Sequence, residues 1–113
     1  MKIGVDVVAI ERVERMLSER PTMEARLFTA TESDYCRGRA NPARHFAGTL
    51  AAKEAVIKAL ELGTLARWGR SIEIVRTEAG APQASVIGYE REPLAVSISH
   101  DGPVALAVCV VPV

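Results

Sequence analysis

The order of periodic segments along this 113-residue chain predicts an α+β fold. The first segment, residues 2–10, alternates like a strand and places Ile3, Val5 and Val7 on one face. Segments with helical periodicity follow as far as residue 62, and short alternating or apolar segments complete the chain. The order is one strand, then helices, then three or four antiparallel strands. It predicts a long helix packed on a small antiparallel sheet.

The helical part of the chain divides into three expected helices. In residues 10–19 an apolar stripe recurs with helical spacing, and Pro21 ends that helix. The segment TATESDYCRG, after Phe28, offers Thr and Ser as caps for a short helix. An Ala-rich stretch from Pro42 to about Leu62 predicts a long helix that Gly63 stops, and residues 64–70 show no regular pattern.

Four strands are expected in the second half of the chain, at 71–77, 83–87, 94–100 and 104–111. Asp101-Gly102 between the last two indicates a tight hairpin. The last strand is apolar on both faces. We therefore expect the long helix to cover one face and a neighbouring subunit to cover the other.

Composition limits the function classes. With no repeat or linker, 1–113 is expected to be a single domain, short enough for self-association to help its stability. A net charge of zero and few aromatic residues argue against nucleic-acid binding. No apolar run approaches the roughly 20 residues of a membrane span, and Asp6 lies where a signal peptide would be apolar, so we expect a cytoplasmic protein. Cys36 and Cys109 lack the spacing of a metal or thiol site.

Asp6 is a candidate functional residue because it lies within an apolar strand. A carboxylate among Ile and Val is costly unless something pairs with it. It is either a structural acid that caps a helix or bonds an arginine, or a metal ligand or general base with a shifted pKa.

One flank of the long helix carries charge beside small residues. An arc of about 80° on this helix holds five residues: Arg44, Ala47, Ala51, Glu54 and Lys58. The arc lies next to an apolar stripe that would face the sheet. The stripe consists of Phe46, Leu50, Ile57 and Leu60. Small side chains would let a bulky ligand approach, while the cations suit phosphate and the acid suits Mg²⁺. The alternative is that Glu54 and Lys58 form an i,i+4 surface pair. Lys53 projects within the apolar stripe and must find a partner.

The segment VSISHD forms a third cluster. Ser97 and Ser99 share one strand face, and His100 lies on the other, at the strand end beside the turn. No GxSxG motif surrounds either serine, so a hydrolase nucleophile is not expected. His100 is either a structural histidine or a ligand for a phosphate or hydroxyl.

Together and in this order, the three clusters resemble the holo-acyl-carrier-protein synthase type of 4′-phosphopantetheinyl transferase. The matching segments are GVDVVAIERVERM at 4–16, RHFAGTLAAKEAVIKAL at 44–60 and VSISHD at 96–101, with LFTATE, SIEIV and GAP between them. The resemblance covers essentially the whole chain. It implies the α+β fold of that family, assembled as a homotrimer with active sites between subunits.

The resemblance also implies roles for individual residues. Asp6 and Glu54 match Mg²⁺ ligands, and Lys58 matches a lysine that meets the phosphates. Arg44, Ser99 and His100 match positions that bind coenzyme A. Arg12, Met16 and Arg26 match the surface that receives an acidic helix of the carrier protein.

The reaction implied is attack by a serine hydroxyl of an apo acyl carrier protein on the β-phosphate of coenzyme A. Phosphopantetheine is transferred and 3′,5′-adenosine bisphosphate leaves. The base is either a metal-bound water oriented by Asp6 or Glu54 itself. The rival hypothesis is a non-catalytic trimer of the same fold that binds coenzyme A.

The chain departs from the family pattern in places. An Arg and an aromatic residue usually precede AAKEA, where this chain has Thr49 and Leu50. The segment KALELGT replaces the usual KAFGTG, and Ser71 stands where an acidic residue is frequent. Fatty-acid synthesis is the family's default pathway, and the altered Thr49-Leu50 pair leaves a polyketide or peptide carrier open.

Overall fold

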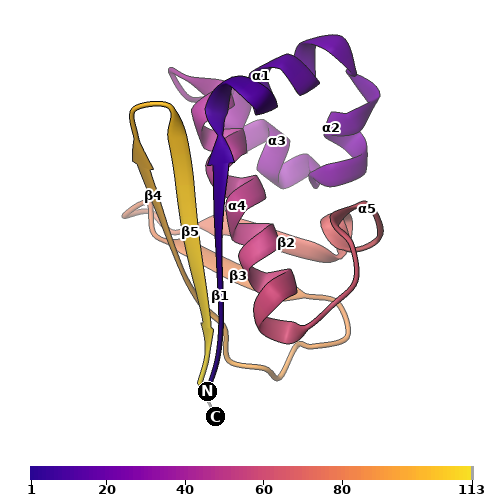
Figure 1. The fold of residues 1–113 in the computed structure, drawn as a ribbon, viewed down its shortest axis with the longest axis vertical. Helices are drawn as coiled ribbons and strands as arrows, with labels where there is room; N and C mark the ends of the chain where they lie inside the picture. Colours follow the sequence, from indigo (N-terminus) through magenta and orange to yellow (C-terminus); the bar gives the residue numbers. More distant parts are fainter. Residues whose placement is uncertain (113) are drawn as a thin grey trace.

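The computed structural model describes residues 1–112, with two antiparallel sheets packed about one long helix (Figure 1). Strands β1 (Lys2–Ala9), β5 (Val104–Val111) and β4 (Ala95–Asp101) form a sheet in the order β1-β5-β4. Strands β2 (Ile72–Arg76) and β3 (Pro82–Val86) form a separate hairpin. The four late strands were all predicted, each to within one residue at either end, and the α+β prediction is confirmed.

The helices occupy the sequence between β1 and β2. They are α1 (Ile10–Glu19), α2 (Thr22–Leu27), α3 (Ala30–Arg37), α4 (Pro42–Leu60) and α5 (Leu65–Trp68), followed by the 3-10 turn η1 (Gly69–Ser71). Figure 1 shows α1, α2 and α3 gathered at one end of α4, with α4 running alongside the sheet. The predicted helices 10–19 and 42–62 are confirmed, the second ending at Leu60.

Three local expectations were wrong. The chain was expected to be irregular at 64–70, and no helix was expected between Pro21 and Phe28, yet α5 and α2 form there. Helices of four and six residues are too short to show a repeating apolar stripe. Gly63 was expected to stop α4, but Glu61 adopts the left-handed conformation (φ 56°) and the Leu62 N–H bonds the Ile57 carbonyl at 2.9 Å. This is the backbone pattern of a Schellman cap, with a glutamate in the position usually held by glycine.

Small residues make the closest contact between α4 and the sheet. A Cβ atom at Gly4 would lie 2.0 Å from the Ala55 carbonyl oxygen and 2.8 Å from the Ala59 nitrogen. Beyond this contact, Val8 of β1 and Ala105 and Ala107 of β5 are buried on the same face. The helix therefore approaches β1 as closely as backbone atoms allow.

This packing corrects the expected roles of two sets of residues on α4. Ala47 and Ala51 are completely buried, so they do not form an open approach for a bulky ligand. In the apolar stripe, Phe46 packs edge-on against Phe28, with ring centroids 4.9 Å apart, rather than on the sheet. The reason is that glycine and alanine let helix and strands meet at short distance, which turns the larger side chains toward the other helices.

The opposite face of the three-stranded sheet is apolar and open in the single chain. Ile3, Val5 and Val7 of β1 are 66%, 50% and 54% exposed, and Leu106 of β5 lies opposite Val7. The expectation that α4 covers one face of β5 is confirmed. Cover of the second face by a neighbouring subunit stays a prediction.

No helix within residues 1–112 combines the length and the apolar character needed to cross a lipid bilayer.

Candidate active site

Asp6 lies on the face of β1 that turns toward α4. It stands between Gly4 and Val8, both buried, and its own side chain is 19% exposed. Because residues two apart share a strand face, the close approach at Gly4 also brings the Asp6 carboxylate to the surface of α4. The carboxylate is thus held next to charged residues of the helix.

Lys58 of α4 meets this carboxylate directly. Its Nζ atom donates hydrogen bonds to Asp6 Oδ1 at 3.1 Å and to the Val5 carbonyl at 2.9 Å. The Lys58 side chain is 52% exposed, so the ion pair contributes at most about 1 kcal/mol to stability. Lys58 therefore pairs across to β1 and not along the helix with Glu54, which was the alternative that helix spacing favoured.

Glu54 lies beside the Asp6–Lys58 pair and is half-buried. Burial and then the nearby Asp6 charge raise the pKa of its carboxyl, while Lys58 and Arg12 act in the opposite direction. Two neighbouring carboxylates, one of which raises the pKa of the other, are a suitable pair of ligands for a hard divalent cation.

The donor set distinguishes among metals. Within residues 1–112, no group of three or more His, Cys, Asp or Glu side chains gathers at one point. Structural zinc and calcium sites need more protein ligands than two. Mg²⁺ commonly keeps several waters and uses one or two carboxylates together with substrate phosphates, so Asp6 and Glu54 fit it.

Arg44 and His100 line a second part of the site, a cavity of about 480 Å³ beside the β4–β5 turn. His100 can pack closely against α4 because residue 48 is glycine: a Cβ atom there would be 2.6 Å from His100 Nε2. Burial and then the Arg44 charge lower the pKa of the imidazole. Ser99, one residue earlier, is exposed on the other sheet face opposite Leu106, so one chain does not bring it together with His100.

The two parts of the site are spread along α4. Ten residues separate Arg44 from Glu54, which corresponds to about 15 Å of helix. A ligand that touched both ends would be elongated and would carry negative charge at each.

Lys53 has found the partner that its apolar surroundings require. Its Nζ atom is buried, forms an ion pair with Glu32 Oε1 at 2.6 Å and donates to the Leu27 carbonyl at 2.8 Å. Glu32 in turn accepts from the Ile74 N–H at 2.7 Å. Burial lowers the pKa of Lys53, and Glu32 opposes that shift. This network ties α4 to α2, α3 and β2, and it leaves Glu54 to face the site.

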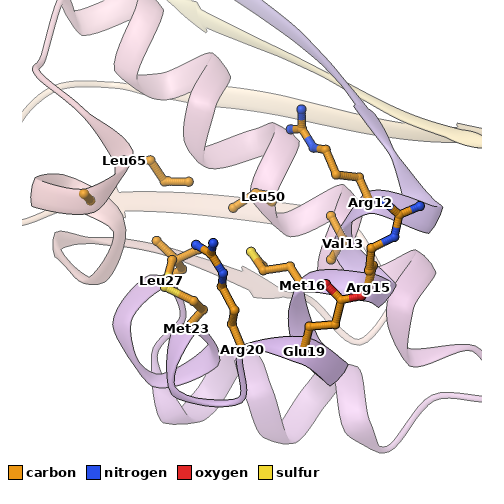
Figure 2. A pocket seen from close by; sticks show the side chains of 11 residues that line it. Arg12, Val13, Arg15, Met16, Glu19, Arg20, Met23, Leu27, Leu50 and Leu65 are labelled. Atoms are coloured by element: carbon orange, nitrogen blue, oxygen red, sulfur yellow. The ribbon is translucent and has the colours of Figure 1, made fainter.

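An apolar groove of about 540 Å³ lies between α1, α2, α4 and α5. Figure 2 shows Met16, Met23, Leu27, Leu50 and Leu65 along it, with arginines of α1 beside them. Of the predicted docking residues, Arg12 and Met16 line this groove. Arg26 lines an adjoining cavity of about 430 Å³, which shares Met23, Leu27 and Ala66 with the groove.

Sequence reasoning missed Arg15, Arg20 and Met23 in this groove. The spacing of Arg12, Met16 and Arg20 by four residues along one helix face was the available signal for Arg20. Met23 could not be found in this way, because it belongs to the short helix α2 and reaches the groove through the fold.

A thiol catalyst is excluded by the surroundings of the two cysteines. Both are buried, and burial raises the pKa of each thiol to about 11. Thiolate nucleophiles need the opposite shift.

Comparison with known proteins identifies the family. A model of the 4′-phosphopantetheinyl transferase superfamily matches residues 2–109. The chain belongs to this superfamily. Within it, the chain is 41% identical to the holo-[acyl-carrier-protein] synthase of Geobacter metallireducens and 42% identical to that of Geotalea daltonii. Each match covers 95% of this chain, with 93% and 94% of those relatives.

Solved structures agree with the sequence relatives. The holo-[acyl-carrier-protein] synthase of Helicobacter pylori in complex with coenzyme A superposes with a TM-score of 0.81 at 30% identity, covering 97% of this chain and 99% of that one. The Bacillus anthracis synthase in complex with CoA (3′,5′-ADP) has a TM-score of 0.84 at 28% identity, covering 97% and 94%. The chain is therefore an enzyme of the holo-[acyl-carrier-protein] synthase type, a phosphopantetheinyl transferase, as the sequence predicted.

Proposed function

We propose that this enzyme transfers the 4′-phosphopantetheine group from coenzyme A to a serine of an apo acyl carrier protein, with Mg²⁺, and releases 3′,5′-adenosine bisphosphate. The single observation that carries the proposal is the meeting of Asp6, Glu54 and Lys58 between β1 and α4, in a chain matched by the family over residues 2–109. Coenzyme A complexes of two similar synthases support the choice of donor.

Asp6 and Glu54 would hold the metal, and Lys58 would stand beside it. When bound, Mg²⁺ supplies charge neutralisation for the pyrophosphate, which is the usual role of this ion in phosphoryl transfer. Lys58 Nζ, already 3.1 Å from Asp6, provides a second positive contact for a phosphate oxygen. Arg44 and His100 bind the far end of the donor, about 15 Å along α4.

The groove between α1 and α2 would receive the carrier protein. Arg12, Arg15 and Arg20 supply positive charge along it, and Met16 and Met23 supply an adaptable apolar floor. An acidic amphipathic helix fits such a surface, with its apolar side in the groove and its carboxylates toward the arginines. Arg26 extends the same surface into the adjoining cavity.

The enzyme is proposed to act as a homotrimer with active sites between subunits. The support is the open face of the three-stranded sheet, on which Ile3, Val5 and Val7 are each at least half exposed. A contiguous apolar sheet face in so short a chain is a surface for self-association. Ser99 lies on that same face, so its predicted contact with coenzyme A requires a neighbouring subunit.

Intact-mass spectrometry tests the proposed reaction. An apo acyl carrier protein incubated with the enzyme, coenzyme A and Mg²⁺ is expected to gain the mass of one phosphopantetheine arm, and EDTA is expected to prevent the gain. The same mixture with the Glu54→Gln enzyme is the matched control. No gain with carrier proteins from fatty-acid, polyketide and peptide pathways would reject the proposal.

A further inference from the structure

The apolar groove between α1, α2, α4 and α5 has walls that need support from the rest of the fold. Two of these helices are short, since α2 has six residues and α5 has four. Isolated helices of that length do not persist in water, so tertiary contacts must hold them. Leu27 of α2, Leu50 of α4 and Leu65 of α5 line the groove (Figure 2). The width of the groove therefore depends on what fixes α2 and α5 relative to α4.

One buried ammonium links the segments that carry these three leucines. Lys53, about one turn after Leu50 on α4, donates from Nζ to the Leu27 carbonyl at 2.8 Å and to the Gly69 carbonyl at 2.5 Å. Leu27 is the last residue of α2, and Gly69 directly follows α5. The third partner of Nζ is Glu32 Oε1, at 2.6 Å. An ammonium has three protons, so these three acceptors use all of its donors.

The two main-chain segments that Lys53 joins also touch each other. A Cβ atom at Gly69 would lie 3.2 Å from Leu27 Cα and 3.2 Å from the Leu27 carbonyl oxygen. The backbone of Gly69 is α-helical, with φ −48° and ψ −49°, a conformation that any residue adopts. Glycine is therefore needed here for the close approach and not for its conformational freedom. The end of α2 and the end of α5 meet at backbone distance, with the ammonium bonded to both.

The carboxylate that completes the link is itself fixed. Glu32 Oε1 accepts from the Thr29 N–H at 2.8 Å, as part of the capping box of α3. Glu32 Oε2 accepts from the Ile74 N–H of β2 at 2.7 Å. The Thr29 hydroxyl donates to Glu73 Oε2, also of β2, at 2.7 Å. Because groups of α3 and β2 hold the carboxylate, the ammonium of Lys53 has one fixed position.

Stability alone does not account for a charged pair at this place. The side chains of Lys53 and Glu32 are both fully buried. Removing two charges from water costs energy that their attraction returns only in part, and apolar residues of similar volume often serve as well. An apolar side chain would fill the same space, but it would give the Leu27 and Gly69 carbonyls no hydrogen bond from α4. What the ammonium adds is directional bonds, which fix both carbonyls relative to the helix.

We propose that Lys53 is a positioning residue for the carrier protein: it sets the spacing of α2 and α5, and with it the width of the groove that receives the acidic helix. This rests on the proposed function, in which the groove is the docking surface. Lys53 is completely buried and touches no ligand, so it acts through Leu27 and Leu65 on the groove walls. Asp6 and Glu54 do not line the groove, so donor binding is not coupled to its width.

Three variants separate the spacing of the walls from the charge of the pair. Lys53→Met removes the ammonium and keeps an unbranched side chain. Gly69→Ala keeps every charge, but its Cβ forces the Leu27 backbone away by a few tenths of an ångström. Gly63→Ala is the matched control, because it lies just before α5 and its Cβ would be 3.6 Å from the nearest atom, an ordinary contact.

Each protein is tested with both substrates below its melting temperature. Calorimetry measures the Kd of coenzyme A, with Mg²⁺, and the Kd of the apo acyl carrier protein that the wild type binds most tightly among the fatty-acid, polyketide and peptide carriers. The intact-mass assay, used here as a mass-gain assay, measures kcat and the KM for that carrier protein. Circular dichroism and sedimentation establish that each variant is folded and assembled like the wild type.

Lys53→Met should weaken carrier-protein binding by roughly 10–30-fold, the upper part of the range for residues that contact neither ligand. Gly69→Ala should act in the same direction by about 3–10-fold, because it displaces the walls less. In both variants the KM for the carrier protein should rise, while kcat at saturating carrier protein and the Kd of coenzyme A stay as in the wild type. Gly63→Ala should match the wild type throughout. Lys53→Met should also melt at a lower temperature, because Glu32 is left buried without its cation.

A folded Lys53→Met enzyme that binds the carrier protein as tightly as the wild type would overturn the proposal. So would wild-type carrier affinity in Gly69→Ala, and this variant decides alone if Lys53→Met does not fold. Equal losses of carrier-protein and coenzyme A affinity would also overturn it, because Lys53 would then support the whole fold and not the groove.

The mass gain of the carrier protein with the wild-type enzyme decides the proposed function separately. Transfer by the wild type, with undiminished carrier binding in both variants, would uphold the reaction and reject the positioning role of Lys53. Carrier binding by the wild type that the two variants weaken, without any transfer, would uphold the positioning role and reject the reaction. A wild-type enzyme that binds none of the carrier proteins would reject both.

Discussion

Replacement of Gly4 by alanine tests the contact that brings Asp6 to α4. The new Cβ would lie 2.0 Å from the Ala55 carbonyl oxygen, about 1.4 Å short of the 3.4 Å at which ordinary contact begins. It would also lie 2.8 Å from the Ala59 nitrogen. Both obstacles are helix backbone, which cannot rotate aside as a side chain does, so β1 must retreat.

Overpacking of a core usually costs about 1–3 kcal/mol. Because the clash at Gly4 is with backbone, we expect the upper end, about 3 kcal/mol, and a fall in melting temperature of about 10–20 °C. The retreat also separates Asp6 from Lys58. Since a displacement of about 1 Å can cost roughly 100-fold in rate, phosphopantetheine transfer should fall by at least that factor in the molecules that remain folded.

Urea unfolding followed by circular dichroism measures the free energy of unfolding, and the mass-gain assay below the transition measures transfer. Gly38→Ala is the control, because a Cβ there would lie 3.4 Å from its nearest neighbour and the backbone φ of −78° suits alanine. We expect that variant to stay within about 1 kcal/mol of the wild type. If Gly4→Ala matched Gly38→Ala in stability and rate, the close approach of β1 to α4 would not be what positions Asp6.

Three further predictions concern charge and assembly. Glu54→Gln should abolish transfer. Because burial raises the pKa of the Glu54 carboxyl, the wild type loses stability as pH rises above 4.5, so without metal the variant should be the more stable of the two at pH 8 and should lose that advantage at pH 3. Urea titrations at the two pH values check the sign, and a less stable variant at pH 8 would contradict it. Arg12→Glu should weaken carrier-protein binding at least tenfold and leave coenzyme A binding unchanged. Both affinities are measured by calorimetry, with Arg91→Glu as the control variant. Equal losses of the two affinities would discredit the groove as the docking surface. Val5→Glu on the open sheet face should convert a sedimenting trimer to monomers, and an intact trimer in that variant would place the interface elsewhere.

Element order and the candidate residues could be predicted because they depend on local pattern. The alternation of residues 2–10 and the helical period of 10–19 and 42–60 survive in the fold, and Asp6 was conspicuous as a charge in an apolar strand. Helices α2 and α5 could not be predicted, since each is shorter than two helical turns and is held by packing on its neighbours. The left-handed Glu61 was equally hidden, because glycine two residues later was the stronger local signal.

Sequence by itself determined the family, the helix that carries Glu54 and Lys58, and the need for a partner at Lys53. Only the tertiary structure decided what those partners are: Glu32 for Lys53, and Asp6 rather than Glu54 for Lys58. It also decided that Tyr35, His45, Arg76 and His100 meet, although they come from two helices and two strands. The physical reason is that periodicity fixes which side of its own element a residue faces, whereas contacts across elements follow from how closely backbones approach, here at Gly4 and Gly48.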